Sequence, residues 1–149
     1  PSDVDTFQRL KYSKPDEWSD LKGLYSYKGR VPEATKADFQ TYKKIKATGI
    51  YGTVRVPAAK IDTSALTLDV AHINERRHGV TQEEAVSYIK NAAFSLKRRH
   101  WTGETFLNYY SEEGASYVRT SDNVIRTSFK KDEFDKKTKS AMEVLKNGK

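Results

Sequence analysis

The chain has 149 residues, of which 36% are hydrophobic and 32% charged, a polar composition that still suffices for one folded domain. It contains no cysteine, which excludes disulfides and thiolate metal sites. A formal net charge of +7 predicts a basic surface that attracts polyanions such as nucleic acid, although a merely soluble basic domain would have the same composition.

The sequence contains no apolar run long enough to span a membrane and no stretch typical of a signal peptide. The sequence begins at Pro1 without a methionine, so we expect a fragment cut from a longer protein. The absence of a targeting segment therefore says little about the parent protein.

Two short helices are predicted in the first third of the chain. Residues 1–31 have weak periodicity and are expected to form an extension or covering layer, with the main domain over 32–149. One helix is predicted to start after Pro15, and a second to run from a Thr35 cap to about Ala47. Their apolar faces would carry Trp18, Leu21 and Tyr25 in the first, and Phe39, Tyr42 and Ile45 in the second.

Alternation over residues 50–56 predicts a strand closed by Pro57. Thr81 and Glu84 form a capping-box pattern, which predicts a helix from Gln82 to about Ala93. The buried stripe of that helix would be Ala85, Val86, Ile89 and Ala92.

Four short strands are predicted next, over residues 94–99, 105–110, 116–120 and 124–129. Turn residues between them favour an antiparallel meander. A last helix is predicted from near Asp132, with Phe134, Thr138, Met142 and Leu145 on one face. The predicted fold class is α+β: N-terminal helices followed by a four-stranded antiparallel sheet and a C-terminal helix.

The densest group of chemically useful side chains lies in residues 69–79, which hold two of the three histidines, two arginines and an acid. A metal site is disfavoured because His72 and His78 lack zincin spacing and two cationic arginines lie between them. The segment also offers no serine nucleophile elbow and no glycine-rich phosphate loop.

Metal-free RNA cleavage suits these residue types better. Histidine transfers protons near neutral pH, and the planar guanidinium of arginine binds two phosphate oxygens. Asp69 could cap a short helix through this stretch, ended by Gly79. On such a helix His72 and Arg76 would share a face, whereas the position of His78 stays open. The alternative is that His72 packs in the core while Arg76, Arg77 and His78 are solvated.

A second candidate set lies on the last predicted strand. Val124, Arg126 and Ser128 would share one face, and Ile125 and Phe129 would face the core, so Arg126 and Ser128 are expected to be exposed. With nearby tyrosines they could bind phosphates, although ordinary polar strand residues have the same pattern. Residues 97–101 are basic with an adjacent tryptophan, which suits phosphate contact plus base stacking, but basic turns are common.

The run from Asp69 through His72-Ile73-Asn74 to Arg77-His78, followed by Val80-Thr81 and Glu84-Ala85, resembles C-terminal domains of phage minor head (MuF-type) proteins. Later matching stretches are Tyr109-Tyr110-Ser111, Gly114-Ala115, Tyr117-Val118, and Ile125-Arg126-Thr127 with Phe129. The resemblance covers roughly residues 50 to 147. Such domains are similar to the barnase, EndoU, colicin and RelE-like group of RNase folds.

This resemblance implies a toxin-like, metal-independent endoribonuclease with no cofactor and RNA as its substrate. The resemblance carries over His72, Arg77, His78 and Thr127 as catalytic residues, with Arg126 beside Thr127 on the late strand. From the residue pattern we add Arg76 to the catalytic candidates, and the candidate substrate-binding residues are Arg126, Ser128, Tyr110, Tyr117 and Arg99. One extra residue between the histidines leaves open which of Arg76 and Arg77 is functional. Catalytic residues vary within this fold, so an inactive member is an open alternative.

The resemblance also implies a phage head or larger parent protein, and a site of action in the cytoplasm after delivery or association with a virion. A basic toxin site would fit an acidic immunity protein. Two other functions stay open. One is a non-catalytic nucleic-acid-binding module of a virion protein, and the other is an ADP-ribosyltransferase toxin, against which the missing Glu-x-Glu signature counts.

Overall fold

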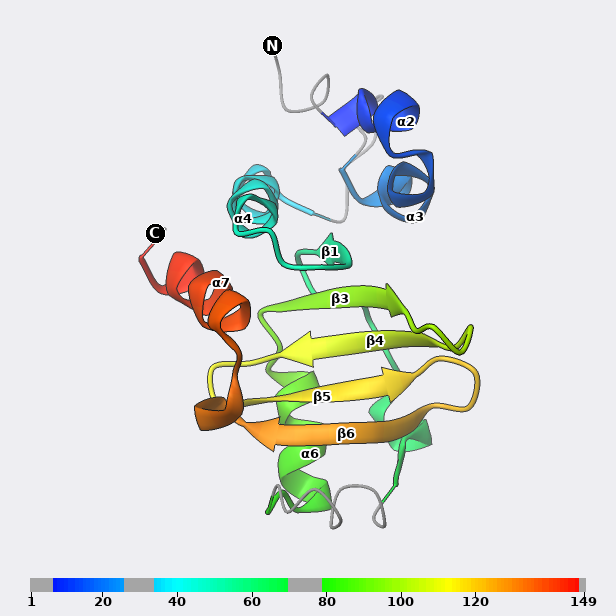
Figure 1. The fold of residues 1–149 in the computed structure, drawn as a ribbon, viewed down its shortest axis with the longest axis vertical. Helices are drawn as coiled ribbons and strands as arrows, with labels where there is room; N and C mark the ends of the chain where they lie inside the picture. Colours follow the sequence, from blue (N-terminus) through cyan, green and yellow to red (C-terminus); the bar gives the residue numbers. More distant parts are fainter. Residues whose placement is uncertain (1–6, 26–33, 70–78, 148–149) are drawn as a thin grey trace.

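A computed structural model describes residues 7–25, 34–69 and 79–147, which form an α+β fold around a six-stranded mixed sheet (Figure 1). The helices are α2 (Leu10–Ser13), α3 (Pro15–Tyr25), α4 (Lys36–Ala47), α6 (Gln82–Lys90) and α7 (Lys136–Asn147). The strands are β1 (Thr53–Arg55), β2 (Thr67–Leu68), β3 (Phe94–Arg99), β4 (Thr105–Tyr110), β5 (Gly114–Arg119) and β6 (Val124–Lys130). Short 3-10 turns cover Thr63–Ala65 and Lys131–Glu133.

The predicted antiparallel meander is confirmed as β3-β4-β5-β6, but the prediction of a four-stranded sheet is wrong. The full order is β1-β3-β4-β5-β6-β2. β1 pairs antiparallel with β3, and the two-residue β2 pairs parallel with β6. Periodicity could not supply β2, because two residues are too short to alternate visibly.

Local capping chemistry positions the helices as the sequence predicts. The Thr35 side chain accepts from the Asp38 amide and the Asp38 carboxylate accepts from the Thr35 amide, and Thr81 and Glu84 repeat this reciprocal pair. The last helix starts later than predicted, at Lys136. The Asp135 carboxylate accepts from the Thr138 amide at 2.8 Å and caps it there.

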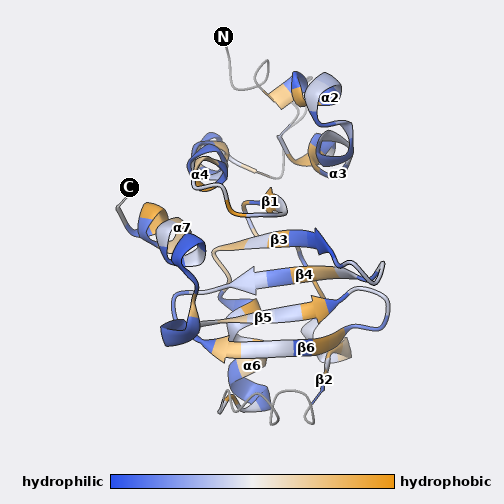
Figure 2. Ribbon diagram, viewed as in Figure 1, coloured by the Kyte–Doolittle hydropathy of each residue, from blue (hydrophilic) through white to orange (hydrophobic). Residues whose placement is uncertain are grey.

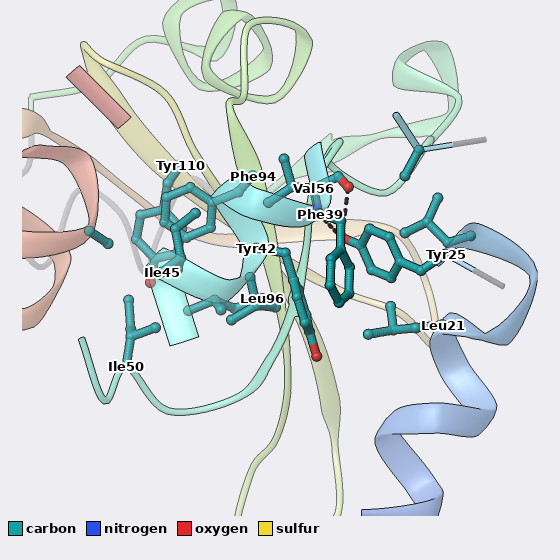
Figure 3. Packing of buried hydrophobic residues seen from close by; sticks show 14 of the residues in the cluster. Leu21, Tyr25, Phe39, Tyr42, Ile45, Ile50, Val56, Phe94, Leu96 and Tyr110 are labelled. Carbon is teal, nitrogen blue, oxygen red and sulfur yellow. Dashed lines mark hydrogen bonds between the residues drawn. The ribbon is translucent and has the colours of Figure 1, made fainter. Parts of the chain in front are cut away.

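Helices cover the two faces of the sheet unequally. α6 packs against one face, where Ala85, Tyr88 and Ile89 meet Tyr109, Val118 and Ile125. The opposite face is covered near β1 and β3, where α3, α4 and α7 pack over Val54, Phe94, Leu96 and Tyr110 (Figure 3). Aromatic rings of α3 and α4 pack against one another in this second core, with ring centroids of Tyr25 and Phe39 5.1 Å apart.

A β-bulge in β6 changes which side chains face the core. Tyr117 pairs with Thr127 while its neighbour Val118 pairs with Ile125, so Arg126 is an extra, unpaired residue. The predicted alternation therefore fails at this point, and Ile125 and Ser128 both face α6. The expectation that Ser128 is exposed is wrong, because its exposed fraction is 0%.

Candidate functional site

The start of the histidine-containing segment lies against the bulge of β6. The amide of Asp69 donates to the carbonyl of Ile125 at 3.0 Å, continuing the parallel pairing of β2 with β6. The Arg126 Nη1 lies 2.7 Å from the Asp69 Oδ2, in an ion pair whose side chains are 38% and 27% exposed. The fold thus joins the two candidate sets, which are 57 residues apart in the sequence.

His72, Arg76, Arg77 and His78 lie outside the described residues, as does the helix predicted through them. The residues on either side of this segment are anchored. Before it, Asp69 lies beside β6; after it, Val80 is buried in the core cluster that α6 forms with the sheet. The described residues that flank the segment thus lie beside β6 on one side and in the α6 core on the other.

Two further predicted site residues, Tyr117 and Thr127, pair with each other across β5 and β6. Their strand neighbours Ser116 and Ser128 face α6, so Tyr117 and Thr127 project from the opposite face. Both are partly exposed. The phenol of Tyr117 is hydrogen-bonded to Tyr110 at 3.0 Å, and burial raises its pKa, so it remains a neutral hydrogen-bonding group at physiological pH.

Tyr110 and Ser128, predicted to bind substrate, are parts of the core. Tyr110 is 1% exposed and stacks on Phe94 with ring centroids 5.1 Å apart. The Ser128 hydroxyl lies 2.9 Å from that of Ser116 and 3.0 Å from the carbonyl of Ala115. Neither hydroxyl faces solvent, so a substrate at the surface would not contact them directly.

Arg99, also predicted to bind substrate, is exposed at the end of β3, which is three strands away from the β6 that carries Arg126. Beside it, Arg98 donates from Nε to the carbonyl of Tyr51 at 2.7 Å and lies over the Tyr51 ring. Sequence reasoning missed this pair. The available signal was Gly52 within a strand pattern, which is typical of a close backbone approach.

Across residues 7–25, 34–69 and 79–147, no group of three or more His, Asp or Glu side chains could hold a metal ion. The helices within these ranges include none that is long and apolar enough to cross a bilayer. Arg126, Tyr117 and Thr127 offer a cation and two hydroxyls, which are groups that bind an anionic oxygen.

A scan of protein-family models, a search of curated proteins and a search of solved structures each found no match to this chain. The resemblance to MuF-type domains therefore stays a prediction.

Proposed function

We propose that this chain is a metal-independent endoribonuclease. His72 would act as general base or acid, and His78 would carry the complementary proton. Arg126, with Arg76 or Arg77, would bind the phosphate, and the hydroxyls of Thr127 and Tyr117 would orient it.

The observation that carries this proposal is the contact between Asp69 and Arg126 at 2.7 Å. Ion pairs this exposed contribute only about 0–1 kcal/mol to stability, so the pair matters chiefly for position. It holds the residue three positions before His72 against the arginine of the late strand. A histidine supplied by this segment and a guanidinium from β6 could then act on one phosphate.

RNA cleavage by transesterification requires a group that accepts a proton, a group that donates one and a cation that binds the phosphate. The RNA 2′-oxygen attacks the adjacent phosphorus while one histidine takes its proton. The bond from phosphorus to the 5′-oxygen breaks, and the second histidine protonates that leaving oxygen. The products are a 2′,3′-cyclic phosphate and a 5′-hydroxyl, and arginine neutralises charge that develops on the phosphate in between.

The test is RNA cleavage in excess EDTA by the wild type, His72→Ala and His78→Ala. His100→Ala is the matched control, since this third histidine lies in the exposed turn after β3. We expect the wild type and the control to leave 2′,3′-cyclic ends, and both other variants to lose at least about 100-fold in rate. Equal cleavage by His72→Ala would remove its role.

A second comparison isolates the phosphate-binding arginine. Arg126→Gln and Lys131→Gln each remove one positive charge. Arg126 lies beside Asp69, whereas Lys131 is exposed in the 3-10 turn that follows β6, so Lys131→Gln controls for the change in net charge. We expect Arg126→Gln to slow cleavage and Lys131→Gln to leave it near wild type. If no variant and no wild type cleaves RNA while binding persists, the chain is a non-catalytic nucleic-acid-binding module.

A further inference from the structure

Two aromatic side chains are exposed at the end of the molecule where β3 finishes. Tyr51 is 70% exposed just before β1, and Trp101 is 89% exposed two residues after β3. Elsewhere in the described chain, Tyr12 is the one other large hydrophobic residue with such exposure. Tyr51 and Trp101 both flank the end of β3, and exposed aromatic rings beside cations are typical of surfaces on which a partner's bases stack.

Arg98 holds Tyr51 in a defined position. Its Nε donates to the Tyr51 carbonyl at 2.7 Å, and its guanidinium carbon lies 5.7 Å from the ring centroid, within cation–π range. Gly52 permits this approach: its φ is +122°, and a Cβ there would lie 3.0 Å from the Arg98 Cγ. Within the described residues, the terminal nitrogens of Arg98 have no hydrogen-bond partner, so they can still bind a phosphate.

The surroundings carry excess positive charge. A groove at this edge is lined by five basic and three acidic side chains: Lys14, Lys46, Lys97, Arg98 and Arg99, with Asp16, Glu17 and Asp20. Glu17 binds Lys46 at 2.6 Å and Asp20 binds Lys97 at 3.1 Å. Outside these two ion pairs the groove has three basic side chains and one acidic side chain. Figure 2 shows this end of β3 as strongly hydrophilic.

We propose that Tyr51, Arg98 and Trp101 form a stacking platform for single-stranded RNA. Exposed rings beside cations are the common design of proteins that bind single strands, since rings stack on bases and cations contact phosphates. A base would lie on the Tyr51 ring face that Arg98 leaves open, and a second base on Trp101. The adjoining phosphate would bind Arg98.

The choice of RNA rests on the proposed function, whereas the platform itself needs no catalysis. β3 and β6 are three strand spacings apart, or about 14 Å. An RNA strand held at the platform could therefore cross the sheet face that carries Tyr117 and reach Arg126. The platform would bind nucleotides that flank the cleaved bond.

The probe is a short fluorescent 2′-O-methyl RNA. It has no attacking hydroxyl and stays intact, so it reports binding whether or not the chain cleaves RNA. We expect Tyr51→Ala and Trp101→Ala each to weaken binding by about tenfold or more at fixed salt. Tyr12→Ala is the matched control, because Tyr12 is comparably exposed on α2, and it should bind as the wild type does. Bound RNA should also quench the fluorescence of Trp101.

Three results would overturn the platform. They are absence of binding by the wild type, wild-type affinity in the double variant Tyr51→Ala/Trp101→Ala, and equal affinity for a duplex, whose paired bases cannot stack on the rings. Self-association of the wild type that Trp101→Ala abolishes, without change in RNA binding, would assign these rings to a protein contact instead. A wild-type chain that binds the probe through the platform but cleaves no unmodified RNA would count against the nuclease proposal alone.

Discussion

Substituting Gly114 by alanine should destabilise the fold by forcing β5 away from its neighbours. A Cβ at this position would lie 2.5 Å from two ring carbons of Tyr88 and 2.6 Å from the carbonyl oxygen of Phe129. Carbon atoms normally approach to about 3.5–4.0 Å, so about 1 Å of displacement is needed. Tyr88 is 5% exposed and Phe129 contributes backbone, so neither can move cheaply.

We expect Gly114→Ala to lower the free energy of unfolding by about 1–3 kcal/mol, the usual cost of overpacking. Urea unfolding followed by circular dichroism measures it as a lower midpoint at unchanged slope. Gly23→Ala is the control, because Gly23 lies within α3 and a methyl group there would have no atom within 4 Å. It should stabilise by about 0.5–1 kcal/mol through helix propensity.

A Gly114→Ala variant within about 0.5 kcal/mol of wild type would refute this reasoning. The double variant with Tyr88→Leu separates the two contacts. Removing the ring should reduce the cost of the alanine by at least about 0.5 kcal/mol, leaving the clash with the Phe129 carbonyl. Strict additivity would mean that the ring is not the obstacle.

Three further substitutions test other parts of the framework by the same unfolding measurement. Tyr25→Phe should lower the free energy of unfolding by about 2 kcal/mol or more. The Tyr25 hydroxyl donates to the carbonyl of buried Val56 at 2.7 Å and accepts from its amide at 3.1 Å, so the variant leaves both groups without this partner. A loss below about 0.5 kcal/mol would contradict this reasoning. Ser116→Ala should cost about 1 kcal/mol by removing the donor to the Ala85 carbonyl, and an unchanged midpoint would show that this bond is dispensable. Asp135→Ala should cost about 1 kcal/mol at neutral pH by removing the α7 cap. The bond from the Thr138 amide lowers the pKa of Asp135, so this difference should be complete above about pH 4 and shrink as pH falls through the folded-state pKa; a difference independent of pH would argue against it.

Elements set by neighbouring residues could be predicted from the sequence. The capping boxes at Thr35 and Thr81 each need residues only three positions apart, and both are present. The four strands of the meander follow from alternation and short turns, and the structure differs from their predicted ends by two residues at most. β3 and β4 match their predicted ranges fully.

Features set by distant contacts could not be predicted. The two-residue β2 exists because it pairs with Val124 and Ile125, which lie far along the chain. The predicted α6 stripe omits Tyr88, yet this residue is buried because glycine at position 114 leaves room for its ring. The sequence alone suggests that Tyr110 offers an available hydroxyl, and its burial follows from stacking against β3 and contact with Phe134 ahead of α7.

The bulge at Arg126 explains both an error of prediction and the geometry of the candidate site. With strict alternation, Ile125 and Ser128 would point to opposite faces, and one of them would leave the α6 core. The extra residue lets both face α6 while Thr127 stays beside Tyr117 on the other side. It also leaves Arg126 outside the regular pairing, beside the Asp69 that follows β2. Positioning of the guanidinium therefore requires β2 and the bulge together, which is why a period of two read from β6 alone could not locate it.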